Sequence, residues 1–323
     1  MAGDSVTVVD RLSRLLELTR PGITTAAHHR VAVSLIMLSS LGLSFGGLIL
    51  RNVEHATPWQ INSYRAVAQI TVLIVILAIQ HRARALNQLR GIGAPGLLAG
   101  SLMGLAPIGY VFSLSHTTVA NTLFIISAIP FITAVLAWLF LGEKVRTGTW
   151  IAMTIAAMGI LVMVIEGFGV GSLFGNVMAL ATALLFSCFA VIVRNRRGIN
   201  MMPTLIISGL ITGLICSVVS ISQLIIPPQD MLLCLLWGVL SGFGNWMFIA
   251  AARHLAAAEV TLLMLVEFVL GPIWVWLFIN EIPSQYTLIG GVLVLAAVSG
   301  RALVDLRTQQ TGAATGKAPG PVG

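Results

Sequence analysis

Long apolar runs, interrupted only by short polar connections, dominate this sequence. Hydrophobic residues make up 57% of its 323 residues, and Asp, Glu, Lys and Arg together only 9%, against roughly 25% in soluble domains. Several runs reach the ~20 residues that a helix needs to cross a ~30 Å hydrocarbon core. The runs therefore exclude a water-soluble enzyme, a nucleic-acid-binding protein and a disordered chain. They predict an all-α integral membrane protein.

The apolar runs predict ten transmembrane helices. These cover approximately residues 32–50, 60–80, 94–114, 118–141, 149–166, 173–193, 203–226, 230–252, 257–280 and 284–302. Connections such as residues 115–117 and 281–283 are very short. Neighbouring helices must therefore form antiparallel hairpins.

The basic residues predict the orientation of these helices. If residue 1 lies in the cytosol, sixteen of the 18 Lys and Arg residues fall in cytosolic segments, Arg51 falls outside, and Arg65 lies within the second span. Basic loops mark the cytosolic side of a membrane protein. We therefore expect a multi-pass protein of the cell (inner) membrane with both termini cytosolic. The net charge of +7 then needs no nucleic-acid partner.

The two ends of the chain lie outside the predicted spans. Residues 1–31 have no signal-peptide pattern, and apolar residues recur at helical spacing beside Arg11 and Arg14. This cytosolic segment is either a helix on the inner membrane surface or a frayed tail. Residues 303–323 are expected to be a disordered cytosolic tail, because Gly, Ala, Thr and Pro follow Thr308 without periodicity.

The two halves of the chain resemble each other. Residues 97–151, shifted by 138 positions, align without a gap with residues 235–289. The matched pairs include His116 with His254, the Trp-Leu-Phe triplets beginning at Trp138 and Trp276, and Glu143 with Glu281. Each half holds five spans, an odd number, so we expect residues 32–166 and 173–302 to be two inverted five-helix repeats. Such repeats are the basis of alternating access in secondary transporters.

The same motifs carry a family resemblance. They are Tyr64-Arg65 in the second span, the run from Pro130 to Glu143, and its echo from Glu267 to Glu281. These residues resemble the EamA domains of the drug/metabolite transporter superfamily, and the resemblance covers residues 32–302. It implies that spans 1, 3, 4, 6, 8 and 9 surround a cavity, with spans 5 and 10 peripheral. It implies no particular substrate.

Two ionisable residues lie well inside predicted spans. Glu267 is about ten residues, or ~15 Å, into the ninth span and so near the membrane midplane, and Arg65 is about five residues into the second. A charge at the bilayer centre costs roughly 2.5–3.5 kcal/mol. Both residues are therefore candidates for charge binding or coupling, with Glu267 binding a proton or a cationic substrate group. The alternative for each is a structural polar anchor.

Polar and aromatic side chains on several spans predict the wall of a substrate cavity. The candidates are Ser40, Ser44, Tyr110, Ser113, Thr133, Asn176, Ser187, Ser241, Asn245, Trp246, Glu267 and Trp274. For any single hydroxyl the alternative is a hydrogen bond to the carbonyl four residues earlier in its own helix. Their convergence from several helices favours a shared polar interior.

Glycine and proline within the spans predict close packing and bending. Pro130, Gly271 and Pro272 are candidate hinges of gating helices, the alternative being static kinks. Glycines four residues apart, as at Gly100 and Gly104, let helices approach closely.

Together these patterns predict a secondary transporter that moves a small metabolite (amino acid, organic acid or amine) by alternating access, most simply as an exporter, with or without protons. The alternatives are a lipid-carrier flippase or a carrier of a bulkier amphipathic compound. We expect no enzyme, cofactor or metal, because the sequence has no GxxxxGKS, HExxH or CxxC pattern. The expected partners are the substrate and the lipid bilayer, and the chain is a monomer or a homodimer.

Overall fold

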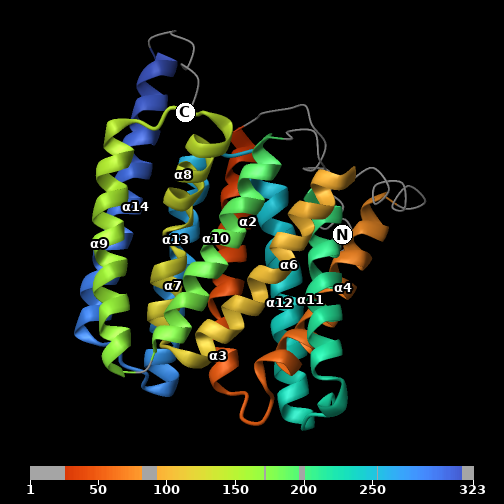
Figure 1. Cartoon of the computed structure of the whole chain (residues 1–323). Helices are drawn as coiled ribbons and strands as arrows, with labels where there is room; N and C mark the ends of the chain where they lie inside the picture. The colour runs from red at the N-terminus through yellow and green to blue at the C-terminus, as the bar shows by residue number, and fades with distance from the viewer. Residues whose placement is uncertain (1–25, 82–92, 171, 196–200, 253, 315–323) are drawn as a thin grey trace, which may run out of the picture.

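The computed structural model describes residues 26–81, 93–170, 172–195, 201–252 and 254–314, which form an all-helical bundle (Figure 1). Its helices are α2 (Ala26–Ser44), α3 (Gly46–Arg51), α4 (Pro58–His81), α6 (Gly93–His116), α7 (Val119–Ile126), α8 (Ile129–Leu141), α9 (Thr147–Val170), α10 (Leu173–Asn195), α11 (Met201–Val219), η2 (Ile221–Gln223), α12 (Pro228–Ala252), α13 (Ala257–Ile279) and α14 (Gln285–Ala314). Within the described residues, nine helical segments are long and apolar enough to cross a membrane, and Pro203–Val219 is a shorter apolar helix. These segments correspond to the ten predicted spans.

Two predicted spans are interrupted helices. α2 and α3 meet at Phe45, and α7 and α8 meet at Ser127 and Ala128. Pro130 therefore lies in the first turn of α8, where the missing N–H of a proline needs no partner, rather than inside a continuous helix. Pro272, by contrast, lies inside α13.

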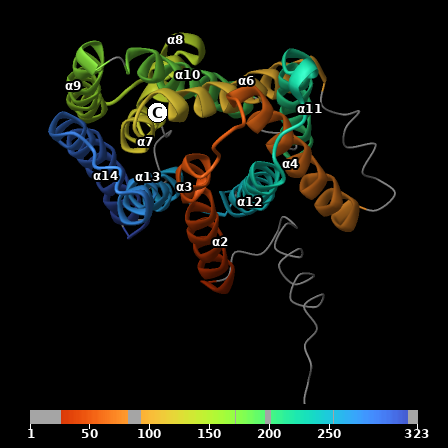
Figure 2. The ribbon, with the colours of Figure 1, turned by 90° about the horizontal axis from the view of Figure 1, so that it is seen from below.

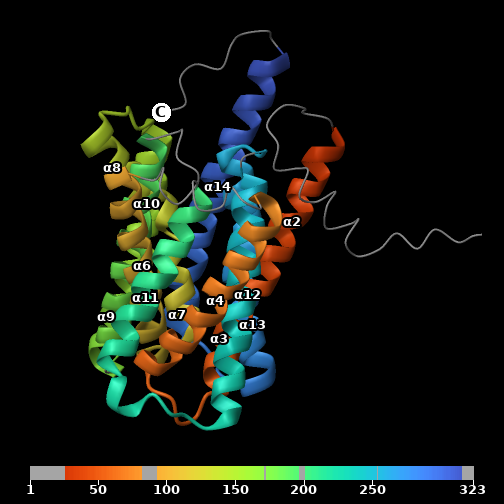
Figure 3. The ribbon, with the colours of Figure 1, turned by 90° about the vertical axis from the view of Figure 1, so that its right-hand side faces the viewer.

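The structure corrects two predicted boundaries. α11 ends at Val219 rather than near residue 226, and the 3-10 turn η2 follows it. α14 continues to Ala314, so residues 303–314 are helical rather than disordered, and the helix rises beyond its neighbours (Figure 3). An ion pair one turn apart, from Arg301 Nη2 to Asp305 Oδ1 (2.5 Å), supports this extension. The predicted surface helix and residues 315–323 lie outside the described residues.

Hydrogen bonds group the helix ends into two opposite ends of the bundle. Arg51 at the end of α3 binds the carbonyls of Leu114 and Thr117, between α6 and α7, and the carboxylate of Glu281 after α13. We call this the Arg51 end, and the opposite end, where α8 is followed by Glu143, the Glu143 end. Because Gly175 packs against Thr117, α10 begins at the Arg51 end, whereas α2 and α3 run toward it (Figure 1).

Matched helices of the two halves pack in an exchanged pattern. α6 packs against α11 of the second half, where a Cβ added at Gly104 would lie 2.8 Å from the Ser208 carbonyl oxygen. α12, the counterpart of α6, packs against α4 of the first half, where a Cβ added at Gly238 would lie 2.3 Å from the Arg65 carbonyl oxygen. These contacts and the opposite helix directions support the inverted relation, which itself stays a prediction.

The Trp-Leu-Phe triplets lie on the outer surface of the bundle. Phe140 and Phe278 are 74% and 65% exposed, and Trp138 and Trp276 are also exposed. Each triplet lies close to a helix end, α8 at the Glu143 end and α13 at the Arg51 end. Aromatic side chains gather at this depth where a membrane meets water. The triplets therefore mark the repeat and the lipid-facing surface, not the cavity.

Candidate functional site

A cavity of about 240 Å³ lies inside the bundle. Residues of both halves line it, and it is slightly smaller than the roughly 300–1,000 Å³ of drug-sized pockets. Viewed from the Arg51 end, α9 and α14 stand at one edge of the bundle (Figure 2). α9 contributes no residue to the wall and α14 only Val298. The second and seventh spans, α4 and α11, do contribute, which departs from the arrangement that the resemblance implied.

Polar side chains on six helices, and one in the break between α7 and α8, face this cavity. They are Arg65, Gln69, Tyr110, Ser127, Thr182, Ser208, Ser241, Asn245, Thr261 and Glu267. Large apolar side chains fill much of the remaining wall, among them Met103, Phe186, Phe189 and Phe248. A few polar groups within an apolar wall are typical of a small-molecule site.

Arg65 is a buried cation on this wall. It is 6% exposed, and its guanidinium carbon lies 4.7 Å from the ring centroid of Trp237 on α12, a cation–π distance. Its Nε has no hydrogen-bond partner in the part of the chain that the structure describes. The backbone of Arg65 is held in place because Gly238 packs directly against its carbonyl oxygen.

Glu267 faces the same cavity from the middle of α13, the helix Ala257–Ile279. Tyr110 on α6 lines the same cavity, and its ring centroid lies 6.2 Å from that of Trp237. Among the described residues, no ion pair joins Arg65 to Glu267. The wall thus presents a cation, two aromatic rings and a carboxylate around one space.

The structure places part of the predicted set on the wall. Tyr110, Ser241, Asn245 and Glu267 line the cavity together with Arg65 and Pro130, while their role in substrate binding stays a prediction. The sequence analysis missed Gln69 and Trp237. Each has a signal in the sequence, because Gln69 lies one helical turn after Arg65, and Trp237 one turn before Ser241.

Eight residues predicted to line the cavity lie elsewhere. They form a second group of side chains, most of which join neighbouring helices. They are Ser40, Ser44, Ser113, Thr133, Asn176, Ser187, Trp246 and Trp274, none of which lines the cavity. The indole Nε1 of Trp274 donates to the Ser44 hydroxyl (2.9 Å), and Ser113 bonds Thr122 (2.8 Å). Asn176 accepts a hydrogen bond from Asn121. A buried polar group must be satisfied, and here a neighbouring helix often satisfies it.

Of the remaining members of this second group, Thr133 is half-buried on α8, and the others join helices or are buried. The Ser187 hydroxyl donates to the Ile129 carbonyl (3.3 Å), linking α10 to α8. Trp246 packs in an apolar cluster with Leu73 and Ile249, and Ser40 is buried within α2.

The two other candidate hinges also lie off the wall. A Cβ added at Gly271 would meet the Leu123 side chain at 2.2 Å, so this glycine brings α13 close to α7. Pro272 lines a separate, almost wholly apolar pocket beside Trp276. Whether they or Pro130 act as hinges stays a prediction.

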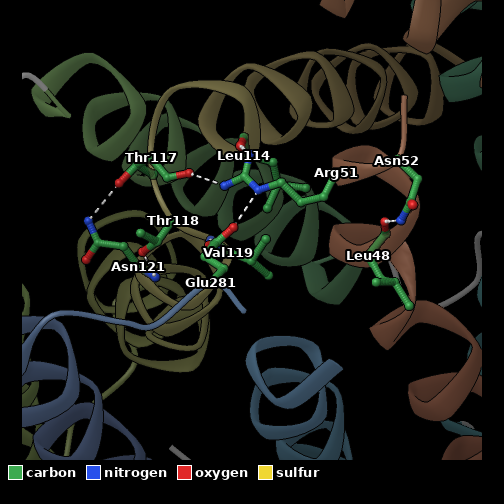
Figure 4. Close-up of polar contacts among 9 residues, drawn as sticks. All are labelled: Leu48, Arg51, Asn52, Leu114, Thr117, Thr118, Val119, Asn121 and Glu281. Atoms are coloured by element: carbon green, nitrogen blue, oxygen red, sulfur yellow. Dashed lines mark hydrogen bonds and ion pairs between the residues drawn. The ribbon is translucent and has the colours of Figure 1, made fainter. Parts of the chain in front are cut away.

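A polar cluster ties the Arg51 end together (Figure 4). Arg51 Nε donates to Glu281 Oε2 (2.5 Å), while its two terminal nitrogens donate to the carbonyls of Leu114 (2.7 Å) and Thr117 (2.8 Å). Glu281 Oε1 accepts from the Val119 N–H (2.7 Å) at the start of α7. The sequence analysis matched Glu281 to Glu143 and placed Arg51 outside the membrane, without expecting Arg51 and Glu281 to meet.

A second contact closes the same end. Asp230 at the start of α12 is buried and accepts hydrogen bonds from the backbone N–H groups of residues 54–56, at 2.8–3.3 Å. The Tyr64 hydroxyl donates to the Leu224 carbonyl (2.7 Å). The start of α12 therefore lies against the connection before α4, and α4 contacts the connection before α12 (Figure 3).

The cavity extends from mid-bundle toward the Glu143 end. Its wall includes Leu205 and Thr261, within the first two turns of α11 and α13, and Ile249 in the last turn of α12. These three residues lie near the Glu143 end. The Arg51 cluster and the Asp230 contacts stand at the opposite end.

Two segments of the chain, residues 30–165 and 173–300, match the EamA-like transporter family. The chain belongs to this family. It is therefore a transporter rather than an enzyme, and family membership implies a membrane-embedded protein with a small-molecule substrate. The two matched segments coincide with the predicted five-helix halves.

Related EamA-like and solute-carrier proteins resemble most of this chain. It is 25% identical over 271 residues to the pseudopaline exporter CntI of Pseudomonas aeruginosa (strain UCBPP-PA14), covering 82% of this chain and 93% of that protein. It is 24% identical over 285 residues to human solute carrier family 35 member G1, covering 83% of this chain and 77% of that protein. A solved crystal structure with 19% identity aligns with a TM-score of 0.60, covering 86% of this chain and 98% of that one.

Proposed function

We propose that this chain is a secondary transporter that exports a small metabolite across a bacterial inner membrane by alternating access through the central cavity. The observation that carries the proposal is the pair of opposite charges, Arg65 and Glu267, on the wall of a cavity between two EamA-like halves. Charged groups at membrane depth mark substrate or ion pathways.

The position of the cavity is compatible with export. Basic residues predict that the Glu143 end faces the cytosol, and the wall reaches toward that end. The Arg51 cluster then stands at the periplasmic end, and a cavity reached from the cytosol is the arrangement in which an exporter takes up its substrate. A relative named as a pseudopaline exporter agrees with this direction.

The inverted relation of the halves supports alternating access. Counterpart helices run in opposite directions and exchange packing partners, so each half can adopt the arrangement of the other. One chain encloses the whole cavity, so either a monomer or a homodimer is compatible with the proposal.

Blocking the cavity tests the proposal. Ser241 faces it from α12, so Ser241→Trp should reduce transport to background because an indole fills the space. Substrates are first found by thermal stabilisation of the purified protein with amino acids, organic acids and amines, since binding stabilises the folded state. Their movement is then measured in proteoliposomes.

The matched control is Phe243→Trp, two residues away on the same helix, where the side chain is exposed on the outer surface of the bundle. It should transport like the unmodified protein. Unimpaired transport by a folded Ser241→Trp variant would place the pathway elsewhere. Transport of a lipid-linked carrier, with no small metabolite moved, would favour the flippase.

A further inference from the structure

We infer that the cavity selects a small zwitterion, whose carboxylate binds Arg65 beside the Trp237 ring and whose ammonium group binds Glu267. The inference rests on the proposed function and names the substrate class of the same site.

Arg65 is a buried cation for which the described residues supply no anionic partner. The side chain is 6% exposed, its Nε lacks a partner among the described residues, and its guanidinium lies over the uncharged ring of Trp237. A buried guanidinium is costly unless paired. Its planar fork of N–H donors matches a carboxylate, which it binds through two parallel hydrogen bonds.

Glu267 is the corresponding acidic residue, for which the described residues supply no cationic partner. It lies in the middle of α13 and faces the cavity, and the structure describes neither a hydrogen bond nor an ion pair to its carboxylate. Tyr110 lines the same cavity and adds an aromatic ring to its wall. An ammonium group suits both a carboxylate and an aromatic face.

One ligand with both charges can pair with Arg65 and with Glu267 at the same time. Arg65 and Glu267 come from α4 and α13, in different halves of the chain, and no described ion pair joins them. An amine alone leaves Arg65 unpaired, and a carboxylic acid alone leaves Glu267 unpaired. A zwitterion neutralises both and adds no net charge to the protein, so the membrane potential does not oppose its movement.

The size and the remaining wall limit the ligand. About 240 Å³ admits a small molecule. Gln69, Ser241 and Asn245 offer polar contacts, while Met103 and Phe248 offer apolar surface. The wall therefore suits a zwitterion with a modest apolar side chain.

Matched ligands test the inference on the unmodified protein. Leucine carries both charges, isopentylamine lacks the carboxylate and 4-methylpentanoate lacks the amine; phenylalanine, phenethylamine and 3-phenylpropanoate form a larger set. Truncating one partner of a buried charge pair costs on the order of 30-fold or more in affinity. Isothermal titration on the purified, full-length chain should therefore find at least one zwitterion bound roughly 30-fold more tightly than both of its truncated analogues.

Variants assign each end of the ligand. Arg65→Gln should abolish the preference for the zwitterion over the amine without weakening binding of the amine. Glu267→Gln should abolish the preference for the zwitterion over the acid without weakening binding of the acid. Glu259→Gln, on the same helix but paired with His29 rather than facing the cavity, should leave both preferences intact. If Arg65→Gln does not fold, Arg65→Lys keeps the charge without the planar fork and should reduce the same preference.

Equal binding of a zwitterion and one of its analogues, or no binding by either set, would overturn the inference. The proposed function has a separate readout. If the protein transports an amine or an acid, and Ser241→Trp blocks that transport, the proposed transport function stands and the inference of a zwitterionic substrate fails.

Discussion

At the scale of single residues, two side chains dominate the account because their burial is expensive. Arg65 and Glu267 stand out in the sequence as charges inside apolar runs, and the structure brings both to one cavity. Most of the serine and threonine residues predicted to line the cavity lie elsewhere. A serine in a membrane helix is satisfied by its own helix or by a neighbour, as Ser44 and Ser113 are, so a hydroxyl alone predicts a cavity poorly.

Glu267→Gln tests proton coupling. If this carboxylate binds a proton during the cycle, replacing it with an amide removes the titrating group while keeping its size. Transport in proteoliposomes should then lose its dependence on pH, and an imposed proton gradient should no longer change the rate.

Glu259→Gln serves as the control on the same helix and should keep the pH profile of the unmodified protein. A pH dependence unchanged in Glu267→Gln would discard the coupling role.

At the scale of elements, glycines and a polar cluster determine how the helices meet. Hydropathy predicted that the helices exist, because apolar runs of span length are unambiguous. It could not predict the breaks at Phe45 and at Ser127, because each lies within a run whose hydropathy stays high across the break. The periodicity of a helix shows which residues share a face, but not which neighbour that face meets. Trp237 was missed for this reason.

Gly238→Ala should destabilise the contact between α12 and α4. The added methyl group would lie 2.3 Å from the Arg65 carbonyl oxygen, a backbone atom that cannot rotate away. We expect a loss of about 1–3 kcal/mol, the usual cost of overpacking, together with weaker ligand binding because Arg65 is displaced. Thermal unfolding in detergent measures the first effect and titration the second.

Gly42→Ala is the matched control, since a Cβ at that helical position meets nothing within 4 Å. It should leave stability unchanged or slightly raised, because alanine favours helix. Equal behaviour of the two variants would show that Gly238 is not a packing contact.

Arg51→Gln tests the polar cluster at the Arg51 end. The change removes the hydrogen bonds to Leu114 and Thr117 and leaves the largely buried Glu281 carboxylate without its cation. We expect a loss of about 1–3 kcal/mol in stability. A double-mutant cycle with Glu281→Gln, measured by thermal unfolding, should show that the two effects are not additive. Additive effects would mean that the two residues act independently.

At the scale of the whole molecule, the internal repeat is the sequence feature on which the predicted two-half arrangement depends. A gapless shift of 138 residues anticipated two five-helix halves, and the two EamA-like segments fall on them. The repeat also places Glu143 and Glu281 at opposite ends of the bundle. What no repeat can show is the register in which the halves face each other. That register decides which polar residues share the cavity.

The most direct measurement of the central claim is the accessibility of a cysteine at Ser241 to a membrane-impermeant maleimide. Asn52→Cys and Gly148→Cys mark the two ends, since both positions are exposed and lie at the Arg51 end and the Glu143 end respectively. The unmodified chain, whose Cys216 and Cys234 are buried and Cys188 partly so, is the blank. The account predicts that Asn52→Cys reacts only from the periplasmic side, Gly148→Cys only from the cytosolic side, and Ser241→Cys from both. Reaction of Ser241→Cys from one side alone, under every substrate and pH condition, would contradict alternating access through this cavity.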